Sequence, residues 1–201
     1  MSSSERRDHE RALRHQLIIT AARELAEAEG WEAVTTRRLA ERVEYGQPVL
    51  YSHFKGKDAI VRAVAVEGFD DLAAALRRAR SAADPPRGAL RAVGRAYLDF
   101  AAARPALYAA MFVMETGLPF AREDTPPALR AAFEELLAAA GGTRDRARDE
   151  LHAEVVWSAL HGLAVLAGAG RIPPERQRER LDVLVGRFGQ DGPGSTGGRD
   201  A

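Results

Sequence analysis

The chain has 201 residues, and its 29 basic and 29 acidic side chains give zero formal net charge, so any DNA contact must come from a local basic face. It contains no cysteine, which excludes disulfides, thiolate metal sites and cysteine nucleophiles. No apolar run approaches the roughly 18 to 20 residues of a membrane span, and the start MSSSERRDHERALR is charged, so we expect a soluble, cytoplasmic protein.

The composition favours helices. Alanine, leucine, arginine and glutamate dominate, β-branched residues are sparse, and no strand-length alternating run occurs, so the predicted fold class is all-α. Both ends are polar and lack apolar periodicity. We expect a disordered arm over residues 1–10 and a disordered tail over 189–201, where five glycines and one proline fall in thirteen residues.

Four helices are expected in the first part of the chain, over residues 12–29, 36–43, 47–54 and 57–82. The first ends at Gly30, a residue typical of helix C-termini. Thr35 can cap the second, and Pro48 suits the first turn of the third because its missing N–H has no partner to lose there. Five further helices are expected over 87–103, 105–114, 126–140, 144–168 and 174–188, which gives about nine in all.

Two short helices joined by a tight turn match the helix-turn-helix arrangement that fits a helix into the major groove of DNA. In the segment QPVLYSHFKGK, Leu50 and Phe54 are four residues apart and are expected to face inward. The remaining side chains then form an outer face that consists of Gln47, Val49, Ser52 and His53, with Tyr51 at its edge.

The segments TTRRLAERV and LYSHFKGKDAI resemble the DNA-binding signature of the tetracycline-repressor (TetR) family, and the likeness covers about residues 16–64. It implies a three-helix DNA-binding domain over 11–56 and a larger helical ligand-binding and dimerisation domain over 57–188. Carried over by position, it implies that Thr36, Tyr51, His53 and Lys57 contact phosphates, while Gln47, Pro48, Val49 and Ser52 approach base edges. Thr35 and Arg37 complete the predicted DNA-binding set. The alternative is that Tyr51 and His53 only pack.

The turn departs from the family pattern of small residue, glycine, hydrophobic residue and serine, because Val43, Glu44, Tyr45 and Gly46 stand there. Either Glu44 adopts a left-handed backbone angle at a cost of about 1 kcal/mol or more, or the turn has another shape with Gly46 in place of the serine cap. Operator preference is therefore not transferable from the family.

Arginines at positions 6, 7, 11 and 14 could reach a minor groove or the DNA backbone. With acids at 5, 8 and 10 they can equally form a solvated face. We favour the solvated face and leave these arginines out of the predicted site.

The helix expected from residue 144 is apolar around its circumference between Val155 and Ala169, apart from Ser158 and His161. Its own domain can cover one face, and the opposite face favours a second copy of the chain. The last two long helices resemble the pair that forms a four-helix bundle between TetR-like protomers. The predicted dimer interface is Val156, Leu160, Leu163, Leu181, Leu184, Val185 and Phe188.

The segment VWSALHGL resembles a Trp-x-x-x-His-Gly signature of one C-terminal subgroup of the same superfamily. His161 is then either a polar anchor in a mostly apolar ligand pocket or a hydrogen-bonded core histidine. Aromatic residues and Met111 between positions 97 and 120 are further pocket candidates, although each can be plain core. The predicted ligand-binding residues are Tyr97, Phe100, Tyr108, Met111, Phe112, Trp157 and His161, with Phe120 as an additional candidate.

Nothing in the sequence proposes catalysis, a cofactor or a metal. The five histidines form no i, i+4 pair, and Gly168, Ala169 and Gly170 follow a helix where a phosphate loop would follow a strand. We expect a homodimeric repressor that is released from a near-palindromic operator by an unknown, largely apolar small molecule. The alternative is a helical small-molecule binding protein without DNA function.

Overall fold

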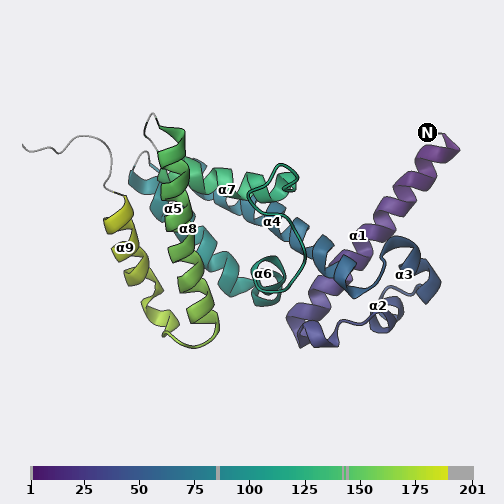
Figure 1. Ribbon diagram of the computed structural model, residues 1–201. Coiled ribbons are helices and arrows are strands. Elements are labelled where there is room, and N and C mark those ends of the chain that lie inside the picture. The colour runs from purple at the N-terminus through teal and green to yellow at the C-terminus, as the bar shows by residue number, and fades with distance from the viewer. Residues whose placement is uncertain (1, 85–86, 142, 144, 190–201) are drawn as a thin grey trace, which may run out of the picture. The chain divides into compact units, whose positions relative to one another are not determined.

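The computed structural model describes residues 2–84, 87–141, 143 and 145–189; over these ranges it contains nine α-helices and no strand (Figure 1). The predicted all-α class is therefore confirmed. The helices are α1 (Ser3–Glu29), α2 (Thr36–Arg42), α3 (Gln47–His53), α4 (Lys57–Ser81), α5 (Arg87–Ala103), α6 (Pro105–Phe112), α7 (Pro127–Ala140), α8 (Arg146–Gly168) and α9 (Gln177–Phe188). Two 3-10 turns, η1 (Trp31–Ala33) and η2 (Pro174–Arg176), precede α2 and α9.

The chain forms two compact units, which do not follow the expected boundary after residue 56. The first unit contains residues 1–71 and 103–130, and the second contains 72–102 and 131–201. Helix α4 contributes to both units, and α6 belongs to the first unit together with the helix-turn-helix. The predicted tail over 189–201 lies outside the described residues from position 190 onward.

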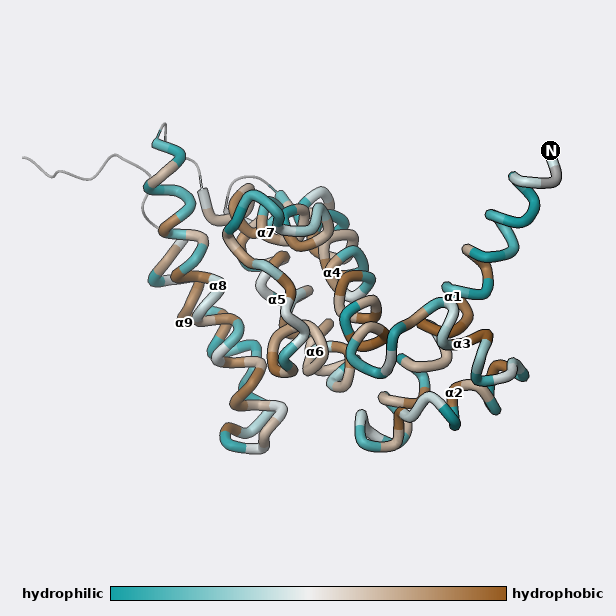
Figure 2. The backbone as a smooth tube through the Cα atoms, turned by 45° about the vertical axis from the view of Figure 1, so that its right-hand side comes forward, coloured by the Kyte–Doolittle hydropathy of each residue, from teal (hydrophilic) through white to brown (hydrophobic). Residues whose placement is uncertain are grey.

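Residues 3–10, which we expected to belong to a disordered arm, lie in α1, which begins at Ser3. The Ser2 hydroxyl accepts a hydrogen bond from the Glu5 N–H at 3.2 Å, and the Glu5 carboxylate accepts one from the Ser2 N–H at 2.6 Å. This reciprocal capping box satisfies two N–H groups that a helix start otherwise leaves unpaired. Apolar periodicity cannot reveal this part of α1, since residues 3–10 are polar (teal in Figure 2) and the side chains of residues 4–10 are exposed.

The first unit has its core where α1 meets the two short helices. Ile18, Ala22 and Leu25 of α1 are buried, as are Leu39 of α2 and Leu50 of α3. These α1 residues follow the i, i+4, i+7 spacing of a single helix face. The apolar face of α1 therefore forms the support on which α2 and α3 are mounted.

Helix α6 is fixed to α1 at its first turn. The Glu27 carboxylate accepts hydrogen bonds from the backbone N–H groups of Ala106 (3.1 Å) and Leu107 (2.8 Å). The Trp31 indole donates to the Ala106 carbonyl at 2.8 Å. A carboxylate at a helix N-terminus satisfies free N–H groups and complements the helix dipole. Sequence reasoning missed Glu27 and Trp31, because no local pattern shows a cap that comes from another helix.

The second unit packs α5, α7, α8 and α9 with the last turns of α4. A Cβ atom at Gly94 of α5 would lie 2.7 Å from the Leu181 side chain and 3.3 Å from that of Leu160. Only glycine therefore allows α5 to approach α8 and α9 this closely. Val156 and Leu160 of α8 and Leu184 of α9 are buried in the same core.

The middle of α8 exposes an apolar surface. Val155, Val165 and Leu166 are 44%, 39% and 44% exposed. Among the described residues, α8 is the one helix that is long and apolar enough to cross a membrane, by length and composition alone, and 17% of its most apolar window is buried. One copy of the chain therefore covers only part of this helix.

A buried carboxylate ties α4 to α7. Glu135 accepts hydrogen bonds from Arg77 Nε at 2.8 Å and from Arg80 Nε at 2.9 Å. Burial raises the pKa of Glu135, but the hydrogen bonds from the two arginines outweigh it, so the net pKa lies below the ordinary value.

We predict that Glu135→Gln lowers the free energy of unfolding by about 1 to 2 kcal/mol, because it removes charge-assisted hydrogen bonds from a buried site. The stabilisation from Glu135 is present above the unfolded-state pKa of roughly 4.3 and is lost as the pH falls through the lower folded-state pKa. Urea unfolding between pH 3 and pH 7 measures both effects. The control is Glu134→Gln, which removes an exposed pair with Arg146 and should cost less than about 0.5 kcal/mol. Equal losses from both variants would contradict this role.

Candidate nucleic-acid interface

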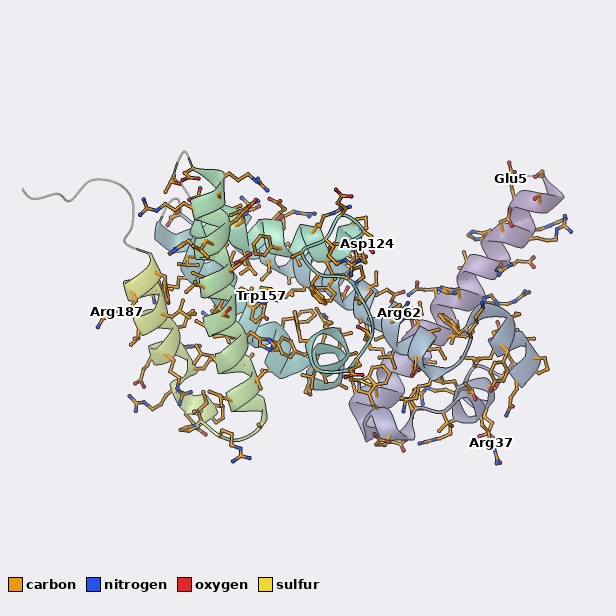
Figure 3. The ribbon with its side chains drawn as sticks, in the orientation of Figure 1. Glu5, Arg37, Arg62, Asp124, Trp157 and Arg187 are labelled. Carbon is orange, nitrogen blue, oxygen red and sulfur yellow. The ribbon has the colours of Figure 1, made fainter. Side chains whose placement is uncertain are left out.

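The helix-turn-helix begins with a capped helix. The Thr35 hydroxyl accepts a hydrogen bond from the Arg38 N–H at 3.2 Å, which starts α2. Leu39 and Ala40 bury one face of α2. The opposite side leaves Arg37, which is labelled in Figure 3, exposed to solvent.

The turn between α2 and α3 uses both alternatives that the sequence left open. Glu44 has a φ of 56°, in the left-handed region, and the Tyr45 N–H donates to the Ala40 carbonyl at 3.0 Å. This bond closes the end of α2 as in a Schellman motif, with Glu44 where glycine is usual. Gly46 is the N-terminal cap of α3, and its carbonyl accepts from the Val49 N–H at 3.0 Å. Glu44 therefore holds backbone strain in this turn.

Helix α3 presents the predicted outer face to solvent. Leu50 and Phe54 are buried at 0% and 4% exposure, whereas Tyr51 is 52% exposed. The side chains of Gln47, Pro48, Val49 and Ser52 are also exposed. Because the two buried anchors are four residues apart, they fix the rotation of the helix about its axis. The exposure of Tyr51 disfavours the alternative that this side chain only packs against the core.

Two predicted phosphate contacts lie together at one edge of α3. The Thr36 and Tyr51 hydroxyl oxygens are 3.4 Å apart, which brings the start of α2 beside the end of α3. The Ser52 hydroxyl donates to the Val49 carbonyl at 2.6 Å and keeps its oxygen as an acceptor. Hydroxyl groups gathered at an exposed edge are suited to hydrogen bonds with phosphate oxygens.

His53 and Lys57 are less exposed than the rest of the predicted set. His53 is half-buried, and its pKa is lowered by burial and then by the positive charges of Arg11, His15 and Arg14. At neutral pH it is therefore a neutral N–H donor. The Lys57 ammonium donates to the Trp31 carbonyl at 2.5 Å, and two of its three N–H donors remain for a phosphate.

The candidate effector residues fall into two groups, one in each unit. In the second unit, the Trp157 indole donates to the Tyr97 hydroxyl at 3.1 Å, while Phe100 is buried and burial lowers the pKa of His161. In the first unit, Tyr108 and Phe112 lie with ring centroids 4.8 Å apart on α6. Met111 is buried beside Gly68 of α4, and Phe120 lies edge-on to Phe69 at 5.8 Å.

The predicted dimer interface requires revision. Val156, Leu160, Leu181, Leu184 and Val185 are buried inside their own unit, because the apolar stripe of α9 faces α5 and α8. Leu163 and Phe188 are half-buried. The apolar side chains that face solvent are Leu151, Val155, Val165 and Leu166 of α8 and Val183 of α9.

Metal ligands do not gather in the described part of the chain. No group of three or more histidine, aspartate or glutamate side chains lies close enough there to hold an ion. The hydroxyl, amide and basic groups of α2, α3 and the start of α4 therefore remain the main candidate site.

Two family models match the chain. The model described as "Bacterial regulatory proteins, tetR family" matches residues 18–64, and "Tetracyclin repressor-like, C-terminal domain" matches residues 90–188. The first match covers the second half of α1, all of α2 and α3, and the first turns of α4, and the second extends from α5 to α9. The two matches are thus in the order that the sequence resemblance implied.

Individual relatives agree with the family models. The chain is 49% identical over 53 residues to the tetracycline repressor protein class C of Escherichia coli, which is 26% of this chain and 24% of that protein. It is 27% identical over 161 residues to the HTH-type transcriptional regulator Rv0681 of Mycobacterium tuberculosis, covering 79% and 72% of the two chains. The chain thus spans about a quarter of the length of the first relative.

A solved structure shares the fold along most of the chain. The TetR transcriptional regulator from Rhodococcus sp. RHA1 has a TM-score of 0.66 at 22% identity, and the match covers 90% of this chain and 97% of that one. At this identity the likeness establishes the arrangement of helices. The likeness concerns the fold alone and does not extend to the ligand or the operator.

Proposed function

Because the chain belongs to the tetracycline-repressor (TetR) family of bacterial regulatory proteins, we propose that it is a transcriptional regulator that inserts α3 into the DNA major groove. One observation carries the proposal: Leu50 and Phe54 anchor α3 by one side, while Pro48, Val49 and Ser52 remain exposed on the other. A helix held in this way offers a row of polar side chains that fits between the backbones of a duplex.

The exposed side chains of α3 divide into two roles. Gln47, Pro48, Val49 and Ser52 lie on the outer face and read base edges, where an amide can recognise adenine in a bidentate manner. Tyr51, with Thr36 beside it at 3.4 Å, binds backbone phosphates. His53, at another edge of α3, adds an N–H donor, and Lys57 at the start of α4 adds a positive charge. Since the whole chain is neutral, this local set must supply the attraction to DNA.

The chain acts as a homodimer that joins through the exposed apolar face of α8 and α9. Leu151, Val155 and Leu166 share one side of α8. Gly162 lies on the same side, and a Cβ atom added there would meet no other part of the unit within 4 Å, so this side is open. A second copy would remove this apolar surface from water. Two α3 helices about 34 Å apart then bind a near-palindromic operator.

A small, largely apolar molecule releases this regulator from its operator, which makes it a repressor in the cytoplasm. Each unit offers its own candidate contacts: Tyr108, Met111 and Phe112 in the first unit, and Tyr97, Phe100, Trp157 and His161 in the second. Burial lowers the pKa of His161, which favours its neutral form beside an apolar ligand. Within the first unit, Glu27 and Trp31 join the first turn of α6 to α1. A ligand that prefers one position of α6 therefore biases the support of the DNA-binding helices.

Binding to DNA is tested with duplexes selected from the parent genome. Lys57→Ala and Tyr51→Ala should weaken binding to every duplex, and Lys57→Ala should lower the salt slope by about one. Gln47→Ala should instead change sequence preference by about 1 to 3 kcal/mol at one position of each half-site. Titrations at several salt concentrations measure all three effects. Thermal unfolding reports whether loss of the Lys57 hydrogen bond to Trp31 alters the fold.

The matched control is Gln177→Ala, which lies in α9 and should leave binding unchanged. If Lys57→Ala, Tyr51→Ala and Gln47→Ala all weakened binding equally and only on certain sequences, the division into phosphate-binding and base-reading residues would be contradicted. A parent protein that shifts no selected duplex would contradict the proposed function itself.

The dimer is tested by Val155→Glu, which places a charge in the proposed apolar interface. Sedimentation equilibrium should show a dimer for the parent at micromolar concentration and a monomer for the variant, because an unpaired buried charge opposes association. Val113→Glu makes the same change at an exposed valine of the first unit and should leave the dimer intact. The proposed interface is contradicted if Val155→Glu and Val113→Glu both remain dimeric or both dissociate.

A further inference from the structure

The N-terminal part of α1 extends the helix-turn-helix unit by several turns. Figure 1 shows this segment continuing beyond α2 and α3, and residues 4–14 are exposed along its whole length. Arg7, Arg11 and Arg14 are spaced i, i+4 and i+7, so they share one side of the helix. We call these three residues the arginine row.

The arginine row points toward the side of α1 that carries α3. Ile18 continues the same spacing four residues after Arg14 and is fully buried in the core beneath the helix-turn-helix. His15, the residue after Arg14, stacks on Phe54 with ring centroids 4.4 Å apart. Its ring lies 6.1 Å from that of His53, the last residue of α3. The row is therefore continuous with the edge of α3 that carries His53, one of the proposed phosphate contacts.

The charges near His53 agree with this placement. Arg11 and Arg14 both contribute, after burial, to lowering the pKa of His53, so their guanidinium groups lie within electrostatic range of α3. Arg14 also pairs with Glu10 at 3.5 Å, but both side chains are about half exposed. An exposed pair of this kind is weak and is readily exchanged for another anion.

We propose that the arginine row binds DNA backbone phosphates beyond the stretch covered by α3, which lengthens the duplex bound by each protomer. The proposal rests on the proposed DNA-binding function. The row spans seven residues, or about 10 Å at 1.5 Å per residue, which corresponds to roughly three base pairs at 3.4 Å each. Guanidinium groups suit phosphate oxygens because their planar N–H donors bind them in pairs.

The helix that carries the row is ordered before DNA arrives. The capping box between Ser2 and Glu5 closes its first turn, so no loop has to fold when the arginines bind. The contact is made by phosphates and therefore adds affinity and salt dependence without adding sequence preference.

The test compares the parent with the triple variant Arg7→Gln/Arg11→Gln/Arg14→Gln, since glutamine keeps the helix and removes the charge. We expect the salt slope to fall by about two to three, with roughly tenfold or greater weakening on every duplex. Hydroxyl-radical footprints should shorten by about three base pairs at each outer end. Circular dichroism should show that the helical content is unchanged.

The control Arg78→Gln/Arg95→Gln/Arg122→Gln makes the same change in net charge at exposed arginines outside α1, α3, α8 and α9. It should keep the parent slope and footprint; losses equal to those of the row variant would overturn the proposal. Glu10→Gln provides a gain-of-binding test, because it removes an acid that competes for Arg14, and it should tighten binding to every duplex.

Two failures can be distinguished. A parent that binds no selected duplex would overturn the proposed DNA-binding function and this inference with it. If the parent binds DNA but the row variant has the same salt slope and the same footprint length as the parent, this inference alone is overturned.

Discussion

The burial of Leu50 and Phe54 determines what α3 can do. Both side chains insert into the core of the first unit, and Phe54 also stacks on His15 of α1. This fixes the rotation of a helix that has only seven residues and that would be marginal in isolation. Gln47 and Tyr51 stay exposed as a consequence. The strain at Glu44, of about 1 kcal/mol or more, is tolerated because the turn it forms places these anchors.

The first unit joins the helix-turn-helix to α6, which a domain boundary after residue 56 would have separated. Glu27 and Trp31 hold the first turn of α6 against α1, and Arg62 of α4 donates to the Thr116 carbonyl at 2.8 Å. Each of these bonds connects segments that are distant in sequence. These hydrogen bonds therefore join α6 to the helix that supports α2 and α3 within one compact unit.

The sequence was sufficient for features that depend on local pattern. The nine helices and the inward orientation of Leu50 follow from periodicity, and Thr35 follows from capping preference. The start of α1 was missed because its signal is a capping box, with no apolar stripe to accompany it. Leu181, Leu184 and Val185 of α9, predicted to lie in the dimer interface, are buried within the second unit, and Leu181 lies against Gly94 of α5. Spacing alone cannot say which neighbour covers an apolar stripe.

The absence of cysteine permits a direct test of whether α3 enters the major groove. A DNA-cleaving iron chelate attached at Ser52→Cys reports which base pairs lie beside α3, and Ser81→Cys at the end of α4 is the control. The account predicts two strong cleavage centres about ten base pairs apart on a selected duplex, one for each protomer. Uniform cleavage, or the same pattern from both attachment sites, would contradict it.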